Sequence, residues 1–170
     1  MKFYIFKLFF FLIFFVSLGL FREYVFVNIN NIIYFKYYKN TTMPIPFMFN
    51  WLTHFSYSTL YYLKYPLTIL FVLIYLISNI YFLKTAIIDK TKFLFYYKIL
   101  IAAYIVIFVI STLLMAYLFI TNQKLNDDEF LISRGLMGLA QSPLISFVLF
   151  AVYLWDKNKL QIHEKGNNSI

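Results

Sequence analysis

The sequence predicts an all-α, polytopic membrane protein with four transmembrane helices. Three long runs contain no Asp, Glu, Lys or Arg, and they cover 19, 25 and 21 residues, at Tyr65–Leu83, Ile99–Gln123 and Gly135–Trp155. Because an α-helix rises ~1.5 Å per residue, about 20 residues cross the ~30 Å hydrocarbon layer of a bilayer. In addition, 62% of the residues are hydrophobic and only 13% are charged, which leaves too few polar residues to cover a soluble core. The segments between the runs are short, so we expect a single membrane domain over residues 1–170.

The first predicted span covers about residues 3–21 and is interrupted only by Lys7, whose long stem can lift its amine to the interface. The same stretch has the form of a signal sequence that ends in the small residues Ser17 and Gly19. The bulky residues around them favour an uncleaved signal-anchor over cleavage. The charged pair Arg22-Glu23 is then expected to mark the exit from the membrane.

The segment between the first two spans mixes polar and aromatic residues. Three asparagines, at positions 28, 30 and 31, suggest a turn, and Pro44 and Pro46 exclude a continuous helix through this segment. After the prolines we expect a short helix around residues 47–62 that lies in the membrane interface. It would place Trp51, His54 and several tyrosines at the depth of the lipid headgroups.

The rest of the chain alternates apolar spans with charged connectors. Pro66 is expected in the first turn of the second span, where a missing N–H is harmless. The predicted elements are a second span at 64–84, a basic connector at 84–98, a third span at 99–121, an acidic loop at 126–129, a fourth span at 135–155 and a polar tail at 156–170.

The distribution of basic residues predicts the orientation. If the N-terminus, the 84–98 connector and the tail share one side, that side holds nine basic and three acidic residues, against six basic and four acidic residues on the other. Cytoplasmic segments of membrane proteins carry the excess of Lys and Arg. We therefore expect a bacterial cytoplasmic membrane protein with both termini in the cytoplasm.

Several function classes find little support in the sequence. The net charge of +8 comes mainly from lysines at the ends of apolar runs, which is typical of contact with anionic lipid and not of nucleic-acid binding. The absence of cysteine excludes disulfides and a cysteine nucleophile. No second metal-ligating residue accompanies His54 at helical spacing, so neither a metal site nor a cofactor is expected. A transporter would typically show intramembrane charges or broken helices in matched halves, and neither is evident.

The fourth predicted span differs from the others because it contains small and polar residues. On a helix, Gly135, Gly138 and Ser142 share one stripe, and Gln141 lies on an overlapping one with Arg134. Pro143 should bend this helix because it cannot donate to the carbonyl of Leu139. The stripe is interpreted either as a packing seam within the bundle or as a docking surface for a partner membrane protein, with a transport pathway as a further alternative. These residues form the candidate interface: Arg134, Gly135, Gly138, Gln141, Ser142 and Pro143.

A second candidate site is a polar cluster on the outer side of the membrane, made of Arg22, Glu23, His54 and Asp128. Arg134 has two interpretations there. It either anchors the fourth span at the interface or forms an ion pair with Glu23 or an acidic residue of the 126–129 loop. No residue is assigned a catalytic role.

The order of these features resembles small bacterial membrane proteins that are encoded beside exosortases. The resemblance covers about residues 10–155. It rests on the following segments: Arg22-Glu23, Met43-Pro44, Trp51-Leu52, Phe55–Leu60 running into Lys64–Thr68, and above all Phe130–Leu144 with its Arg-to-Pro stretch.

The resemblance implies an accessory protein and not the enzyme. Exosortases are polytopic enzymes thought to cleave and transfer proteins with C-terminal sorting signals, and they use a cysteine nucleophile, which this chain lacks. We therefore expect a non-enzymatic accessory protein of an envelope protein-sorting or exopolysaccharide-linked system, in contact with the lipid bilayer and with an exosortase or other polytopic protein. The alternatives are a small permease or channel subunit, and a membrane-embedded enzyme that modifies lipids or glycans.

Overall fold

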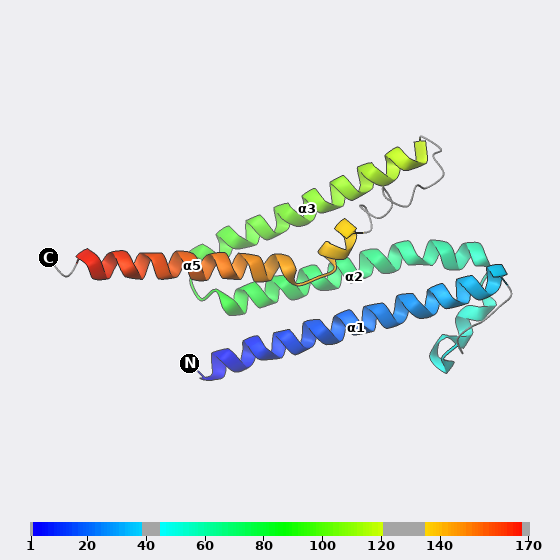
Figure 1. Ribbon diagram of the computed structural model, residues 1–170, viewed down its shortest axis with the longest axis horizontal. Helices are drawn as coiled ribbons and strands as arrows, with labels where there is room; N and C mark the ends of the chain where they lie inside the picture. The colour runs from blue at the N-terminus through cyan, green and yellow to red at the C-terminus, as the bar shows by residue number, and fades with distance from the viewer. Residues whose placement is uncertain (1, 39–44, 121–134, 168–170) are drawn as a thin grey trace.

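The computed structural model describes residues 2–38, 45–120 and 135–167, and every regular element in them is helical (Figure 1). The elements are α1 (Lys2–Tyr38), the 3-10 helix η1 (Phe47–His54), α2 (Tyr57–Ala86), α3 (Lys90–Ile120) and α5 (Leu144–Asn167). A short helix at residues 135–140 precedes α5. The all-α prediction is confirmed for the part of the chain that the structure describes.

Three helices are long and apolar enough to cross a membrane, judged by length and composition. They are Phe6–Tyr37 within α1, the whole of α2, and Lys90–Leu114 within α3. This supports the prediction of a multi-pass helical membrane protein. The structure does not show a fourth helix of this kind among the described residues, because the predicted span at 135–155 is divided into two pieces.

Helix α1 does not end where the sequence suggests. It continues for 37 residues, through Arg22-Glu23 and through the three asparagines that predicted a turn. Two observations explain the difference: Asn28 donates its side-chain amide to the carbonyl of Tyr24 at 2.7 Å, and Ile29 and Ile32 are fully buried. Burial of the isoleucine face outweighs the weak turn preference of asparagine.

The predicted interfacial helix at 47–62 is also two elements. Helix η1 ends at His54, and α2 starts at Tyr57 after the N-cap Ser56, whose hydroxyl accepts from the backbone N–H of Thr59 at 3.2 Å. A serine that satisfies an orphan N–H starts a new helix at this point. Helix η1 packs on the end of α1 in a small core, which consists of Phe49 and Leu52 with Ile29, Ile32, Ile33 and Leu60.

Two further boundaries differ from the predictions. Because α2 starts at Tyr57, Pro66 lies in the helix interior and not in the first turn. The predicted connector at 84–98 shrinks to residues 87–89, since α2 ends at Ala86 and α3 starts at Lys90. Asp89 causes the early start, because its carboxylate accepts from the backbone N–H groups of Thr91 and Lys92 at 2.8 and 3.2 Å.

Helix α2 is central to the bundle and packs against α1, α3 and α5. The main core is rich in aromatic rings: Phe82 lies edge-on to Phe147 of α5, with ring centroids 5.1 Å apart, and Phe15 of α1 stacks on Tyr75 of α2 at 6.3 Å. Such pairs add to the dispersion contacts that hold helices together where lipid is as apolar as the side chains. The aromatic content is therefore partly structural, while many other rings face outward.

Pro143 does more than bend the fourth segment. The helix at 135–140 stops, residues 141–143 form a turn, and α5 starts at Leu144. Pro143 has no N–H for the carbonyl of Leu139, and the hydroxyl of Ser142 donates to that carbonyl instead at 2.7 Å. The N–H of Phe147 then donates to the carbonyl of Pro143 at 3.0 Å, which begins the hydrogen bonding of α5.

Candidate functional site

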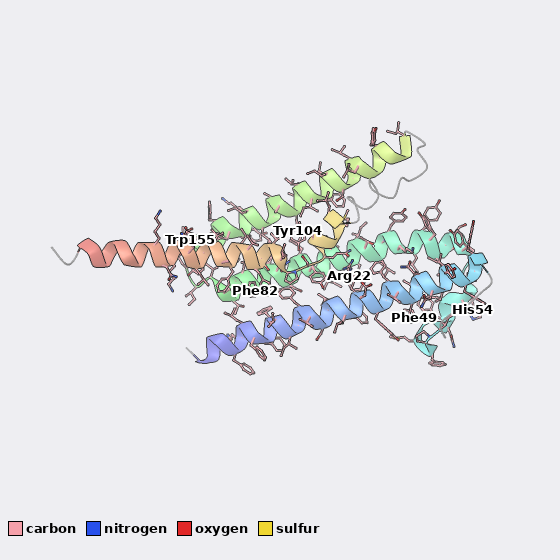
Figure 2. The ribbon with its side chains drawn as sticks, in the orientation of Figure 1. Arg22, Phe49, His54, Phe82, Tyr104 and Trp155 are labelled. Atoms are coloured by element: carbon pink, nitrogen blue, oxygen red, sulfur yellow. The ribbon has the colours of Figure 1, made fainter. Side chains whose placement is uncertain are left out.

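A cavity of about 280 Å³ lies between α1, α2 and the broken fourth segment. It is the strongest candidate for a functional site because it combines charged side chains with apolar walls. Figure 2 shows Arg22 at mid-length on α1, on the side that faces α2. The cavity is lined by Arg22, Glu23, Phe26, Val27, Asn30, Tyr61, Lys64, Tyr65, Thr68, Met137, Gly138 and Gln141.

Each of the three walls is one face of a helix. The residues from α1 are spaced at i, i+1, i+4, i+5 and i+8, and those from α2 at i, i+3, i+4 and i+7. Residues at these spacings lie along one side of an α-helix. The unbroken course of α1 through Arg22-Glu23 is therefore what brings these two charged residues to the cavity.

On the α1 wall, Arg22 is half-buried and Glu23 is exposed. The guanidinium carbon of Arg22 lies 5.9 Å from the ring centroid of Phe26, within the range of a cation–π contact. The Nε of Arg22 is buried and makes no hydrogen bond with the described part of the chain. A buried guanidinium N–H without a partner is costly and is a donor available to a ligand.

On the α2 wall, Lys64 contributes a second positive charge. Its ammonium lies 5.5 Å from the ring centroid of Tyr61, one turn away on the same face. Thr68 follows one turn later and donates its hydroxyl to the carbonyl of Lys64 at 2.8 Å. The sequence identifies Lys64 only as a lysine that flanks an apolar run, and no local pattern shows that it lines the same cavity as Arg22 of α1.

The third wall comes from the predicted interface residues Gly138 and Gln141, together with Met137. Gln141 is almost completely buried, and its side-chain amide donates to the carbonyl of Thr68 at 2.9 Å. Gln141 therefore makes its hydrogen bond within the chain. This bond attaches the turn at 141–143 to α2.

The two glycines of the predicted stripe have open surroundings. A Cβ added at Gly135 or at Gly138 would meet no atom within 4 Å. Gly135 is exposed and Gly138 is half-buried. The described helices therefore do not use either glycine for a close approach, and this part of the 135–140 helix is an unfilled surface.

Ser142 and Pro143 belong to a buried network that the sequence did not reveal. The side-chain amide of Asn79 donates to the hydroxyl of Tyr104 at 2.8 Å and to the carbonyl of Ser142 at 3.2 Å. The amide oxygen of Asn79 accepts from the hydroxyl of Ser146 at 2.7 Å, and that hydroxyl also lies 2.9 Å from the carbonyl of Pro143. Asn79 has no exposed surface. This network connects α2, α3 and α5 beside the helix break, and its only sequence signal was a lone asparagine in an apolar run.

The charges of α2 indicate the depth of the cavity in a membrane. The charge-free stretch between Lys64 and Lys84 has 19 residues, which corresponds to ~28 Å of helix and matches the ~30 Å hydrocarbon layer. Thr68 lies four residues inside the Lys64 boundary, or ~6 Å. The cavity thus lies at the Lys64 end, in one leaflet, and the Asn79 network lies toward the opposite leaflet.

Helix α1 gives the same placement by a separate argument. Its charge-free stretch between Lys7 and Arg22 has only 14 residues, or ~21 Å, which is shorter than the hydrocarbon layer. At least one of these two residues must therefore have its Cα within the hydrocarbon layer, with its side chain either extended to the interface or directed into a polar site. The polar cavity provides the surroundings that such a charge requires at Arg22.

The other predicted site residues lie elsewhere. His54 is exposed at the end of η1, on the outward side of the small core around Phe49, and it does not line the cavity (Figure 2). Asp128 and Arg134 fall outside the described residues, so the predicted ion pair of Arg134 stays a prediction. In the described ranges, no group of three or more His, Cys, Asp or Glu residues is placed to hold a metal ion.

Comparison with known proteins finds no relative of this chain. No protein-family model, no curated protein and no solved structure matches it. Function must therefore be argued from the geometry of the site.

Proposed function

We propose that this chain is a non-enzymatic accessory protein of a bacterial cytoplasmic membrane, and that it docks against a larger polytopic protein of exosortase type through the surface around Gly135 and Gly138. The observation that carries the proposal is the open space at both glycines. Small residues allow a second transmembrane helix to approach closely, which is how helices associate where lipid provides no hydrophobic drive.

The helix break supports this role because it holds the docking surface in place. Gln141 is bound to Thr68, and the carbonyl of Ser142 is bound to Asn79, so both residues that follow the 135–140 helix are attached to α2. A surface held by its own chain loses little conformational freedom when a partner binds. The resemblance of the 130–144 segment to exosortase-associated proteins is the reason for proposing an exosortase-type protein as the partner.

The proposed topology places both termini in the cytoplasm. With three helices able to span the membrane, this requires the broken segment at 135–155 to make the fourth crossing. Broken helices at membrane depth are tolerated where other parts of the protein satisfy the freed backbone groups, and the hydroxyl of Ser142 does this for Leu139. The Lys64 end of α2, and with it the cavity, then lies in the outer leaflet.

The test is association with a co-expressed, epitope-tagged exosortase-type protein in bacterial membranes. Gly138→Leu should abolish co-purification and site-specific crosslinking from position 135, because the leucine fills the surface that the partner helix would occupy. Ala102→Leu is the matched control, since Ala102 is exposed on a different helix, α3, and does not line the cavity. Equal co-purification of both variants would reject docking at Gly138.

The cavity favours a second candidate, a membrane-embedded protein that acts on lipids or glycans. It gathers Arg22, Glu23 and Lys64, two of which belonged to the predicted outer cluster. The broken helix before α5 is one feature that a permease or channel subunit would share. However, transporters typically have a matching break in a second helix, and α1, α2 and α3 are continuous within the described residues. We therefore rank both below the accessory role.

A further inference from the structure

The side chains that line the cavity carry more positive than negative charge, although part of the cavity lies at hydrocarbon depth. Arg22 and Lys64 bring two positive charges to it, and Glu23 brings one negative charge. Placing charge in a bilayer is expensive, so charged residues there typically pair with a partner or mark a pathway or binding site. The side chains that line the cavity therefore carry two positive charges and one negative charge.

The chemistry of Arg22 indicates the kind of ligand. A guanidinium has five N–H donors in a planar fork, which suits the paired oxygens of a phosphate. The Nε of Arg22 makes no hydrogen bond with the described residues, while the ring of Phe26 covers the guanidinium at 5.9 Å. A ligand with phosphate oxygens would satisfy this donor and balance the positive charge of the guanidinium.

The size and position of the cavity indicate that the phosphate belongs to a lipid. The volume of about 280 Å³ lies just below the ~300–1,000 Å³ typical of sites that enclose a small molecule, so it fits a headgroup without its acyl chains. The α2 residues of the cavity run from Tyr61 to Thr68, so the cavity extends from the headgroup level at Lys64 into the hydrocarbon layer. Its rim includes the exposed side chains of Val27 and Tyr65, along which acyl chains can lie.

We propose that this cavity binds the phosphate of an anionic lipid headgroup, with Arg22 as the main hydrogen-bond donor, Lys64 as the second positive charge and Glu23 as a limit on how much negative charge the site accepts. Basic pockets between transmembrane helices are a known mode of lipid headgroup recognition. Gly138 belongs both to this cavity and to the open glycine surface, but the lipid proposal is argued from Arg22, Glu23 and Lys64 and does not require the docking role.

The experiment measures lipid binding to the purified full-length protein in an uncharged detergent by native mass spectrometry. The probes are phosphatidylglycerol, which has a net negative headgroup, and phosphatidylcholine, whose phosphate is balanced by a choline. Wild type should bind phosphatidylglycerol more tightly than phosphatidylcholine. Arg22→Gln should weaken phosphatidylglycerol binding roughly tenfold, the effect of losing a charge-assisted hydrogen bond.

Two further variants keep the test valid if Arg22→Gln misfolds. Glu23→Gln should tighten phosphatidylglycerol binding, because it removes a negative charge beside the phosphate. Lys84→Gln removes a positive charge at the opposite end of α2 and should leave the affinity unchanged. Equal lipid affinities in Arg22→Gln, Glu23→Gln and Lys84→Gln would overturn the proposal.

Inorganic phosphate distinguishes the two sources of the anion. It should compete only weakly with phosphatidylglycerol, because it lacks acyl chains to lie along the rim. If inorganic phosphate bound as tightly as the lipid and with the same dependence on Arg22, the lipid would be the wrong ligand and the site would be one for free phosphate.

Discussion

Replacing Asn79 with leucine tests the buried network most sharply. The side chain makes three hydrogen bonds, to Tyr104, Ser142 and Ser146, and leucine removes all of them while keeping the same branched skeleton of heavy atoms. Hydrogen bonds between transmembrane helices average ~0.6 kcal/mol in double-mutant cycles, so three of them predict a loss of about 2 kcal/mol in the free energy of unfolding. The loss should not be much larger, because the hydroxyl of Ser146 keeps the carbonyl of Pro143 as an acceptor.

The assay is reversible unfolding in mixed micelles with increasing SDS, followed by circular dichroism. Tyr104→Phe removes only one of the three bonds and should cost ~0.6 kcal/mol. In the double variant, the effect of Tyr104→Phe should disappear, since its partner is already absent. Thr85→Val is the control, because the hydroxyl of the half-buried Thr85 bonds to a carbonyl of its own helix, that of Tyr81. Additive effects of Asn79→Leu and Tyr104→Phe would refute the network as a coupled unit.

Three further changes test the fold by the same unfolding assay. Gln141→Leu should cost ~1 kcal/mol and increase proteolysis near residue 141, because it breaks the bond to Thr68; unchanged protection would show that this bond does not hold the turn. Ser56→Ala should cost ~1 kcal/mol through loss of the α2 N-cap, whereas Ser58→Ala, within the first turn, should be neutral; equal effects would contradict the capping role. Phe82→Ala should cost ~2 kcal/mol through the lost packing against rings of both α1 and α5, without the water-transfer contribution of a soluble core, and a loss below ~0.5 kcal/mol would place Phe82 outside the core.

The helical class and the apolar runs of α2 and α3 could be predicted from the sequence, because length and absence of charge are sufficient signals for helices that can span a bilayer. The helix boundaries could not. Charged residues were interpreted as exits from the membrane, but Arg22, Lys64 and Lys90 all lie within helices that continue past them. A charge marks a depth in the membrane and not the end of a helix.

Four of the twelve residues that line the cavity were visible in the sequence, as two separate groups. Arg22 and Glu23 were assigned to an outer polar cluster, and Gly138 and Gln141 to an interface, yet all four line one cavity. Their juxtaposition depends on α1 remaining helical beyond Phe21, which in turn depends on burial of its isoleucine face against η1 and α2. Contacts between segments so distant in sequence have no signature in local residue patterns.

The orientation of α2 in the membrane underlies every conclusion about the cavity. It is best measured by cysteine labelling, which the cysteine-free sequence makes clean. Single cysteines at Tyr62, Ile77 and Ile88, all exposed on the helical bundle, are treated with a membrane-impermeant maleimide on intact cells whose outer barrier has been opened. Tyr62→Cys should react, Ile77→Cys should stay unlabelled within the bilayer, and Ile88→Cys should react only after the cytoplasmic membrane is lysed. Labelling of Ile88→Cys without lysis, or of Ile77→Cys as fast as Tyr62→Cys, would contradict the account.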